Sequence, residues 1–250
     1  MANYNKGLYL EEAINSVVLQ KYNNWNLIII DDCSTDNSRL ILNKFKNKKN
    51  TIKIIYLARN MGVAFSRNLA LRLSKSKYIA FLDSDDYWAP NKLADQISFM
   101  ELKKYDFTYT DYTTFVILNN IKVIKKKIIS PDSFNFKKFI NDTTIATSTI
   151  IIKKSVVGVV KFPKTKTLED YCFKSQILKK GINAIKFNSN SMFYRIVGNS
   201  LSSNKFKNIF WLFYINKKFN KISLFQNIKS IINISISSLK KKYISSDNIV

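Results

Sequence analysis

The stretch 78–86, Tyr-Ile-Ala-Phe-Leu-Asp-Ser-Asp-Asp, is a short apolar run that ends in a cluster of carboxylates. The stretch 27–32, Leu-Ile-Ile-Ile-Asp-Asp, has the same pattern. Continuous apolar runs of this length are typical of strands that are buried in a parallel sheet. Ligands of open α/β sheets bind outside the carboxyl ends of such strands. The two stretches therefore predict two buried strands whose acidic ends lie at a ligand-binding edge.

Helical and strand patterns alternate around these two stretches. The alternation predicts an α/β fold with a mostly parallel, Rossmann-like sheet flanked by helices. After about Tyr105 the pattern loosens into short strands and one helix that ends at Gly181, a residue type common just after a helix. The further predicted helices are 10–18, 34–45, 62–75 and 168–180, and the further predicted strands are 52–57, 107–110, 115–118 and 121–124.

Composition limits the chemistry that the chain can perform. It has 41 Lys and Arg against 17 Asp and Glu, a net charge of +24, which favours anionic partners. AT-rich codons supply Lys, Asn and Ile together, so part of this charge reflects genome composition and not a ligand. The chain has no His, which excludes a histidine base, histidine metal ligands and every histidine-containing triad. Two cysteines, Cys33 and Cys172, cannot form a disulfide framework or a zinc site, so a reducing cytoplasm is the default.

Two carboxylate clusters at one sheet edge repel each other unless a cation lies between them. A hard divalent ion that is chelated by carboxylate and diphosphate oxygens fits this position. The alternative is that the aspartates are solvated loop and helix-capping residues, and either cluster alone leaves this alternative open.

Five motifs occur in the order and in the strand–loop contexts of one known family. They are 2–5 (Ala-Asn-Tyr-Asn), 30–36 (Ile-Asp-Asp-Cys-Ser-Thr-Asp), 60–62 (Asn-Met-Gly) with Arg67 and Asn68, 82–86, and 168–170 (Leu-Glu-Asp). Over roughly residues 2–202 the chain resembles the inverting family 2 glycosyltransferases with the GT-A fold. A single Asp-x-Asp is common by chance, but five ordered motifs are specific.

The resemblance implies a role for each matched position. Ala2 and Tyr4 line the nucleotide base pocket, Asp32 accepts a hydrogen bond from the base, Asn60 shapes a turn, Arg67 approaches the diphosphate, Asp83 faces the ribose or donor sugar, Asp85 holds Mn²⁺ or Mg²⁺, and Asp170 is the general base. In this family the loop at 198–202 often closes over the donor. Without the resemblance, Glu169 and Asp170 read as first-turn acids that favour the helix dipole.

The implied function is transfer of a sugar from a nucleotide diphosphate sugar, expected to be UDP-linked, to a hydroxyl of a cell-envelope glycan or a lipid-linked acceptor, with inversion and a divalent metal. Such a transfer needs a neutralised diphosphate leaving group and one carboxylate base. The alternatives are a basic protein that binds a membrane surface or nucleic acid, a nucleotidyltransferase, which lacks its Gly-rich loop here, and a decayed, inactive transferase. The acidic clusters argue against nucleic acid as a partner.

We expect residues 1–104 to form a nucleotide-sugar-binding half and 105–201 an acceptor-binding half of one GT-A domain. Residues 202–250 are expected to form a basic, amphipathic helical tail, which either binds an anionic membrane surface or packs against the catalytic domain. No signal peptide opens the chain, and no apolar run reaches the ~18 residues of a membrane span. The expected location is the cytoplasm, peripheral on the inner face of the cell membrane.

The first five residues are loop-like, although a sheet of this type has a strand before its first helix. From the sequence we expect no strand in residues 1–5 and an apolar strand upstream of Met1.

Overall fold

The computed structural model describes residues 1–46, 51–197 and 205–243. Its first half contains β1 (Ala2–Asn3), α1 (Gly7–Val18), β2 (Leu27–Asp31), α2 (Ser38–Phe45), β3 (Ile52–Tyr56), α3 (Val63–Leu73), β4 (Tyr78–Ala80), β5 (Tyr87–Trp88) and α4 (Lys92–Lys103). Then follow β6 (Phe107–Leu118), β7 (Ile121–Ile128), β8 (Ser133–Phe134), α5 (Phe136–Phe139), η1 (Thr147–Thr149), β9 (Ile151–Lys153), α6 (Lys154–Val157), α7 (Glu169–Leu178), β10 (Ala184–Arg195), α8 (Lys205–Ile215), the π-helix η2 (Asn216–Asn220) and α9 (Leu224–Tyr243). The α/β class predicted from the sequence is confirmed.

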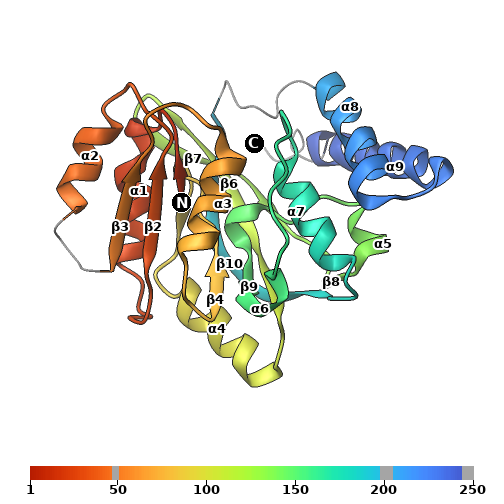
Figure 1. Ribbon diagram of the computed structural model, residues 1–250, viewed down its shortest axis with the longest axis horizontal. Helices are drawn as coiled ribbons and strands as arrows, with labels where there is room; N and C mark the ends of the chain where they lie inside the picture. The colour runs from red at the N-terminus through yellow and green to blue at the C-terminus, as the bar shows by residue number, and fades with distance from the viewer. Residues whose placement is uncertain (47–50, 198–204, 244–250) are drawn as a thin grey trace.

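The strands form two sheets. One has the order β1-β2-β3 with parallel pairing, and it lies at the left of Figure 1 with α1 and α2 beside it. The other has the order β4-β9-β6-β10-β5, with β7 added to β6 and β8 to β10. In it β6 and β10 are parallel, and the other pairs are antiparallel. The parallel β1–β3 sheet therefore lies in the region where the sequence alternates most regularly.

The expectation that residues 1–5 contain no strand is wrong. Ala2 pairs with Ile30 and Asn3 pairs with Asp31 in parallel register. The polar composition hides this strand because the amide of Asn3 donates a 2.8 Å hydrogen bond to the Asp31 carboxylate instead of facing solvent. A cavity of about 730 Å³ lies beside Met1 and is lined by residues of both β2 and β4.

A tight hairpin joins β6 to β7. Asn119 and Asn120 both have positive φ angles, 49° and 63°, which a two-residue hairpin turn of this kind requires. The turn was predicted from these two asparagines, but the strands predicted at 107–110 and 115–118 are one continuous strand, β6. The polar segment between them still pairs because its side chains hydrogen-bond to groups on neighbouring segments of the fold. For example, the Asp111 carboxylate accepts a 2.9 Å hydrogen bond from the Ser130 backbone.

The C-terminal helices pack against the rest of the protein, as one of the two interpretations of the tail predicts. Leu212 and Ile215 of α8 are buried in the core cluster that surrounds α7 and β9, and Ile231 and Ile234 of α9 pack against it. In Figure 1, α8 and α9 lie on the side opposite the β1–β3 sheet. Among the described helices, none is long and apolar enough to cross a membrane.

A buried lysine in α4 gives the fold a dependence on pH. Lys92 is 1% exposed, and its ammonium donates to the Gln96 side-chain oxygen at 2.9 Å and lies over the face of Trp88 at 4.4 Å. Burial lowers the pKa of Lys92 from 10.5 to about 7. Above pH 7 the unfolded chain therefore binds one more proton than the folded chain, and stability increases with pH until that lysine also titrates in the unfolded chain.

We predict that the free energy of unfolding rises between about pH 7 and about pH 9 by up to ~1.4 kcal/mol per pH unit, the limit for one proton. Lys92→Met removes this rise and stabilises the protein most at the lower pH. Lys103→Met, an exposed position on the same helix, keeps it. Urea unfolding at several pH values measures the slopes. Equal slopes for Lys92→Met and the unmodified chain would contradict the assignment.

Candidate active site

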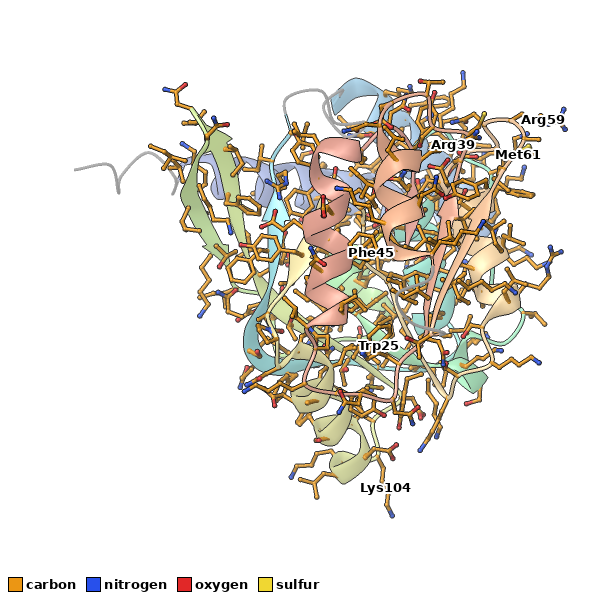
Figure 2. The ribbon with its side chains drawn as sticks, turned by 90° about the vertical axis from the view of Figure 1, so that its left-hand side faces the viewer. Trp25, Arg39, Phe45, Arg59, Met61 and Lys104 are labelled. Atoms are coloured by element: carbon orange, nitrogen blue, oxygen red, sulfur yellow. The ribbon has the colours of Figure 1, made fainter. Side chains whose placement is uncertain are left out.

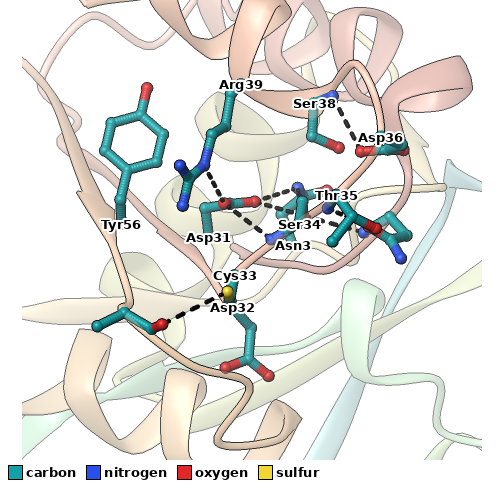
Figure 3. Close-up of polar contacts among 12 residues, drawn as sticks. Asn3, Asp31, Asp32, Cys33, Ser34, Thr35, Asp36, Ser38, Arg39 and Tyr56 are labelled. Atoms are coloured by element: carbon teal, nitrogen blue, oxygen red, sulfur yellow. Dashed lines mark hydrogen bonds and ion pairs between the residues drawn. The ribbon is translucent and has the colours of Figure 1, made fainter.

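The carboxyl end of β2 holds two aspartates that point in different directions (Figure 3). Asp31 is fully buried and accepts hydrogen bonds from the Asn3 amide at 2.8 Å and from the Ser34 hydroxyl at 2.6 Å, while Arg39 lies 3.8 Å away. These contacts fasten the loop after β2 to β1. Asp31 is therefore a structural residue, and its neighbour Asp32 is the candidate site residue of the pair.

Asp32 is buried and holds the turn that precedes α3. Its two carboxylate oxygens accept hydrogen bonds from the backbone amides of Met61 and Gly62, both at 2.7 Å. The Asn60 amide donates to the Asp32 carbonyl at 3.3 Å, so the structure brings these two predicted residues together. Gly62 has φ 88° and ψ 158°, a region that only glycine occupies readily. Each Asp32 oxygen keeps a second lone pair for a ligand.

Cations and the predicted base-pocket residues lie at the same edge. Figure 2 shows Arg39, Arg59 and Met61 gathered at one end of the molecule, and Lys104 at the opposite end. Ala2 is half-buried in β1 and Tyr4 is 46% exposed, so the tyrosine ring is available for stacking.

The loop after β4 carries three carboxylates within four residues. Arg195 fixes this loop, because its guanidinium donates to the Asp85 carbonyl at 2.9 Å and its backbone amide donates to Asp86 at 3.1 Å. Asp86 also accepts a 2.8 Å hydrogen bond from Ser148 of η1. Burial, and then the charges of Asp83 and Asp85, raise the pKa of Asp86 well above its usual value. Asp86 therefore supports the loop from within, while Asp83 and Asp85 remain partly exposed.

The residues present fit a divalent cation that also binds a substrate. Among the described residues, no group of three or more acids or cysteines could hold a metal by itself. Mg²⁺ and Mn²⁺ in phosphate-transferring sites use one or two carboxylates and take their other ligands from phosphates and water. Asp85 offers such a carboxylate, since its side chain is 22% exposed and only one of its oxygens pairs with Lys6, at 2.7 Å.

Asp170 lies in the first turn of α7. One of its oxygens accepts hydrogen bonds from the Thr147 hydroxyl and the Lys174 ammonium, both at 2.8 Å. Burial alone would raise the pKa of Asp170, but the charges of Lys174 and Arg67 outweigh it and hold the pKa well below the usual range. The carboxylate is therefore ionised, which is the form that a general base needs, although the Lys174 ion pair makes it a weak base.

Arg67 connects the two acidic motifs. Its guanidinium donates to Asp83 at 2.6 Å and to Glu169 at 2.8 Å, from different terminal nitrogens, and its side chain is 8% exposed. Burial opposes its charge, but Asp83 and Glu169 raise the pKa of Arg67 above its usual value. The structure thus brings the end of β4 and the start of α7 together, with Asp170 beside Glu169.

Several residues of this arrangement were not predicted from the sequence. Lys174 could have been found, because an acid and a lysine four residues apart on a helix form ion pairs. Lys6 and the η1 hydroxyls of Thr147 and Ser148 carry no such spacing, since they reach the acids only through the fold. The loop at 198–202, expected to close over the donor, lies outside the described residues.

We predict that Arg67→Met lowers the free energy of unfolding by about 3–5 kcal/mol, because it leaves the buried Glu169 carboxylate uncompensated. Arg72→Met, an exposed position on the same helix, should change it by less than about 0.5 kcal/mol. The double variant Arg67→Met/Glu169→Gln should recover part of the loss. Urea unfolding measures all three, and equal values for the two single variants would contradict a buried bridge.

Comparisons with known proteins identify relatives of this chain. The chain is 32% identical over 240 residues to the putative teichuronic acid biosynthesis glycosyltransferase TuaG of Bacillus subtilis, covering 96% of this chain and 94% of the relative. It is 38% identical over 211 residues to an Escherichia coli UDP-Glc:alpha-D-GlcNAc-diphosphoundecaprenol beta-1,3-glucosyltransferase, WfaP, covering 84% and 80%.

Solved structures show the same fold. Staphylococcus aureus TarS 1-349 in complex with UDP-GlcNAc matches 92% of this chain and 68% of its own length, with a TM-score of 0.70 and 20% identity. A mannosyltransferase of Pyrobaculum calidifontis in complex with GDP-Man and Mn²⁺ matches all of this chain and 74% of its own length, with a TM-score of 0.68 and 12% identity. The fold is therefore GT-A, as the sequence predicts.

The family profile described as Glycosyl transferase family 2 matches residues 1–159, more than half of the chain. The chain therefore belongs to glycosyl transferase family 2 and is a glycosyltransferase.

Proposed function

We propose that the protein transfers a sugar from a UDP-linked donor, with inversion, to a hydroxyl of a lipid-linked acceptor in the synthesis of a cell-envelope glycan. The observation that supports this most is the Arg67 bridge, which joins Asp83 after β4 to Glu169 beside Asp170. A donor-binding carboxylate and a candidate base thereby face one site. In this proposal residues 1–104 bind the donor and residues 105–201 bind the acceptor.

The donor half provides contacts for each part of a nucleotide sugar. Tyr4 stacks on the base beside Ala2, and Asp32 accepts a hydrogen bond from it while fixing the Asn60–Gly62 turn. Asp83 hydrogen-bonds the ribose or the sugar. Each terminal nitrogen of Arg67 carries a second N–H besides the one that it donates to a carboxylate, so Arg67 orients Asp83 and can also approach the diphosphate.

Asp85 would hold Mn²⁺ or Mg²⁺ together with the donor diphosphate. A bound divalent ion would supply Lewis-acid neutralisation of the leaving diphosphate. Lys6 lies 2.7 Å from Asp85 and adds a second positive charge at this point of the site.

Asp170 is the proposed general base. As an ionised carboxylate it can accept the proton of an acceptor hydroxyl that attacks the anomeric carbon from the face opposite the diphosphate, which inverts the configuration. Thr147 and Lys174 orient one of its oxygens and leave the other for the hydroxyl.

The acceptor class is inferred from relatives. WfaP is named for an acceptor sugar on diphosphoundecaprenol, a lipid carrier, and TuaG for teichuronic acid biosynthesis. The proposed enzyme therefore works at the inner face of the cell membrane, where such carriers are held.

We predict that UDP with Mn²⁺ raises the melting temperature of the protein. At about 100 times Kd the gain is ~2.7 kcal/mol, or roughly 5–10 °C for a chain of this size. Asp85→Asn should lose most of the shift, and Asp95→Asn, an exposed aspartate of α4, should keep it. A full shift in Asp85→Asn would contradict the metal site, and no shift in any form would contradict a UDP-linked donor.

We predict that removing the Asp170 carboxylate lowers kcat by about 10²–10⁴-fold, the usual contribution of a general base, and leaves donor binding nearly unchanged. Asp170→Asn alone also leaves the buried Lys174 uncompensated, so Asp170→Asn/Lys174→Met is the better test of the chemistry. Rates of sugar transfer and calorimetric titration with UDP-sugar measure the two effects. Transfer within a few-fold of the unmodified enzyme in the folded double variant would exclude Asp170 as the base.

A further inference from the structure

The helix α9 exposes several large apolar side chains to solvent and buries polar ones. Its side toward the protein carries buried polar residues, Asn227 and Ser230, next to the partly buried Ile231 and Ile234. Its side toward solvent carries, besides the exposed Leu224 at its first position, four large apolar residues that are between 45% and 77% exposed. These residues, Phe225, Ile228, Ile232 and Ile236, recur at helical spacing and form one stripe, here named the outer stripe.

The orientation of α9 is fixed by hydrogen bonds. Asn227 donates to the Phe213 carbonyl at 3.0 Å and accepts from the Asn216 amide at 3.1 Å. Ser230 donates to the Ile140 carbonyl, and Asn233 donates to Asn141 at 2.9 Å. A rotation of α9 that buried the outer stripe would break these bonds and leave buried polar groups unpaired, which is costly. The stripe is therefore held outward by the fold.

The charges of the C-terminal segment that carries the outer stripe indicate its partner. Every charged residue from Lys205 to Tyr243 is a lysine. Lys229 lies within the stripe, and Lys217 and Lys221 are exposed on η2 and the turn that precedes α9. A second copy of this chain would bring lysines against lysines, which is unfavourable. A surface with anionic headgroups above an apolar layer suits both the lysines and the isoleucines.

We propose that the outer stripe of α9 inserts into the headgroup region of an anionic phospholipid membrane, with Lys217, Lys221 and Lys229 binding the headgroups. The purpose of this membrane binding rests on the proposed function: it holds the active site near lipid-linked acceptors. α9 lies in the membrane plane and does not cross the bilayer.

The test is flotation of the full chain with two kinds of vesicles, one containing phosphatidylglycerol and one of phosphatidylcholine alone. We expect binding to the anionic vesicles at least about 10-fold tighter than to the neutral ones, and weaker in high salt. Phe225→Ser/Ile232→Ser should reduce the binding at least about 10-fold through lost apolar burial. Leu40→Ser/Leu102→Ser, two strongly exposed leucines of α2 and α4, is the matched control and should bind as the unmodified chain does.

The role of charge is tested by a second pair of variants. Lys217→Glu/Lys221→Glu/Lys229→Glu should lose at least about 100-fold in affinity for the anionic vesicles, because the removal of each positive charge alone costs roughly fivefold. Lys46→Glu/Lys53→Glu/Lys103→Glu changes the net charge equally at exposed positions of the first half and should lose far less. Equal losses in the two triple variants would overturn the proposal in favour of non-specific attraction by net charge.

Two further outcomes would overturn it. One is equal binding of the Phe225→Ser/Ile232→Ser variant and the unmodified chain. The other is a dimer in sedimentation that this variant dissociates, which would assign the outer stripe to a second copy. The UDP-induced melting shift should be the same in all these variants. If the chain binds anionic vesicles but shows no UDP-induced melting shift, this proposal stands and the proposed function is contradicted. If it shows the shift but does not bind the vesicles, the proposed function stands and this proposal is overturned.

Discussion

The buried guanidinium of Arg67 between Asp83 and Glu169 is the contact on which the active site depends. The two acids come from segments 86 positions apart in the chain, the loop after β4 and the start of α7. Without a cation between them they would repel, and the two segments would separate. A single side chain on α3 therefore joins the loop after β4 to the start of α7. The short helix η1 adds to this with hydroxyls that bind Asp170 on one side and Asp86 on the other.

The chain as a whole is strongly positive, but the main acids of the candidate site each have a cationic partner close by. Lys6 pairs with Asp85, Lys174 with Asp170, and Arg67 with Asp83. The overall charge of +24 is thus a property of the surface, whereas the site is an alternation of close opposite charges. In the proposed function, the surface attracts an anionic donor over a long range, and the donor meets preorganised ion pairs at short range.

The alternation of buried strands and helices in the first half could be predicted from local patterns, because apolar runs and helical spacing are set by the nearest neighbours in the chain. The two-residue strand β1 could not, since Asn3 is made compatible with burial by Asp31, which is distant in the sequence. For the same reason Lys6 and Ser148 were missed, whereas Asp83, Asp85 and Asp170 stood out by motif. Periodicity also predicted that the tail is amphipathic, but it cannot tell which face of a helix turns inward. In α9 that is decided by Asn227 and Ser230.

The same asparagine-rich contacts extend to α7. The hydroxyl of Tyr171 donates to Asn216 at 2.7 Å, and Ser175 donates to Asn220 at 2.8 Å, so the buried side of α7 is polar where η2 covers it. A chain shortened before α8 would expose these groups and remove the partners of the residue next to Asp170. Chimaeras that exchange specificity between relatives should therefore transfer α7, η2 and α9 as a unit, since a junction at about residue 202 would cut through one hydrogen-bonded body.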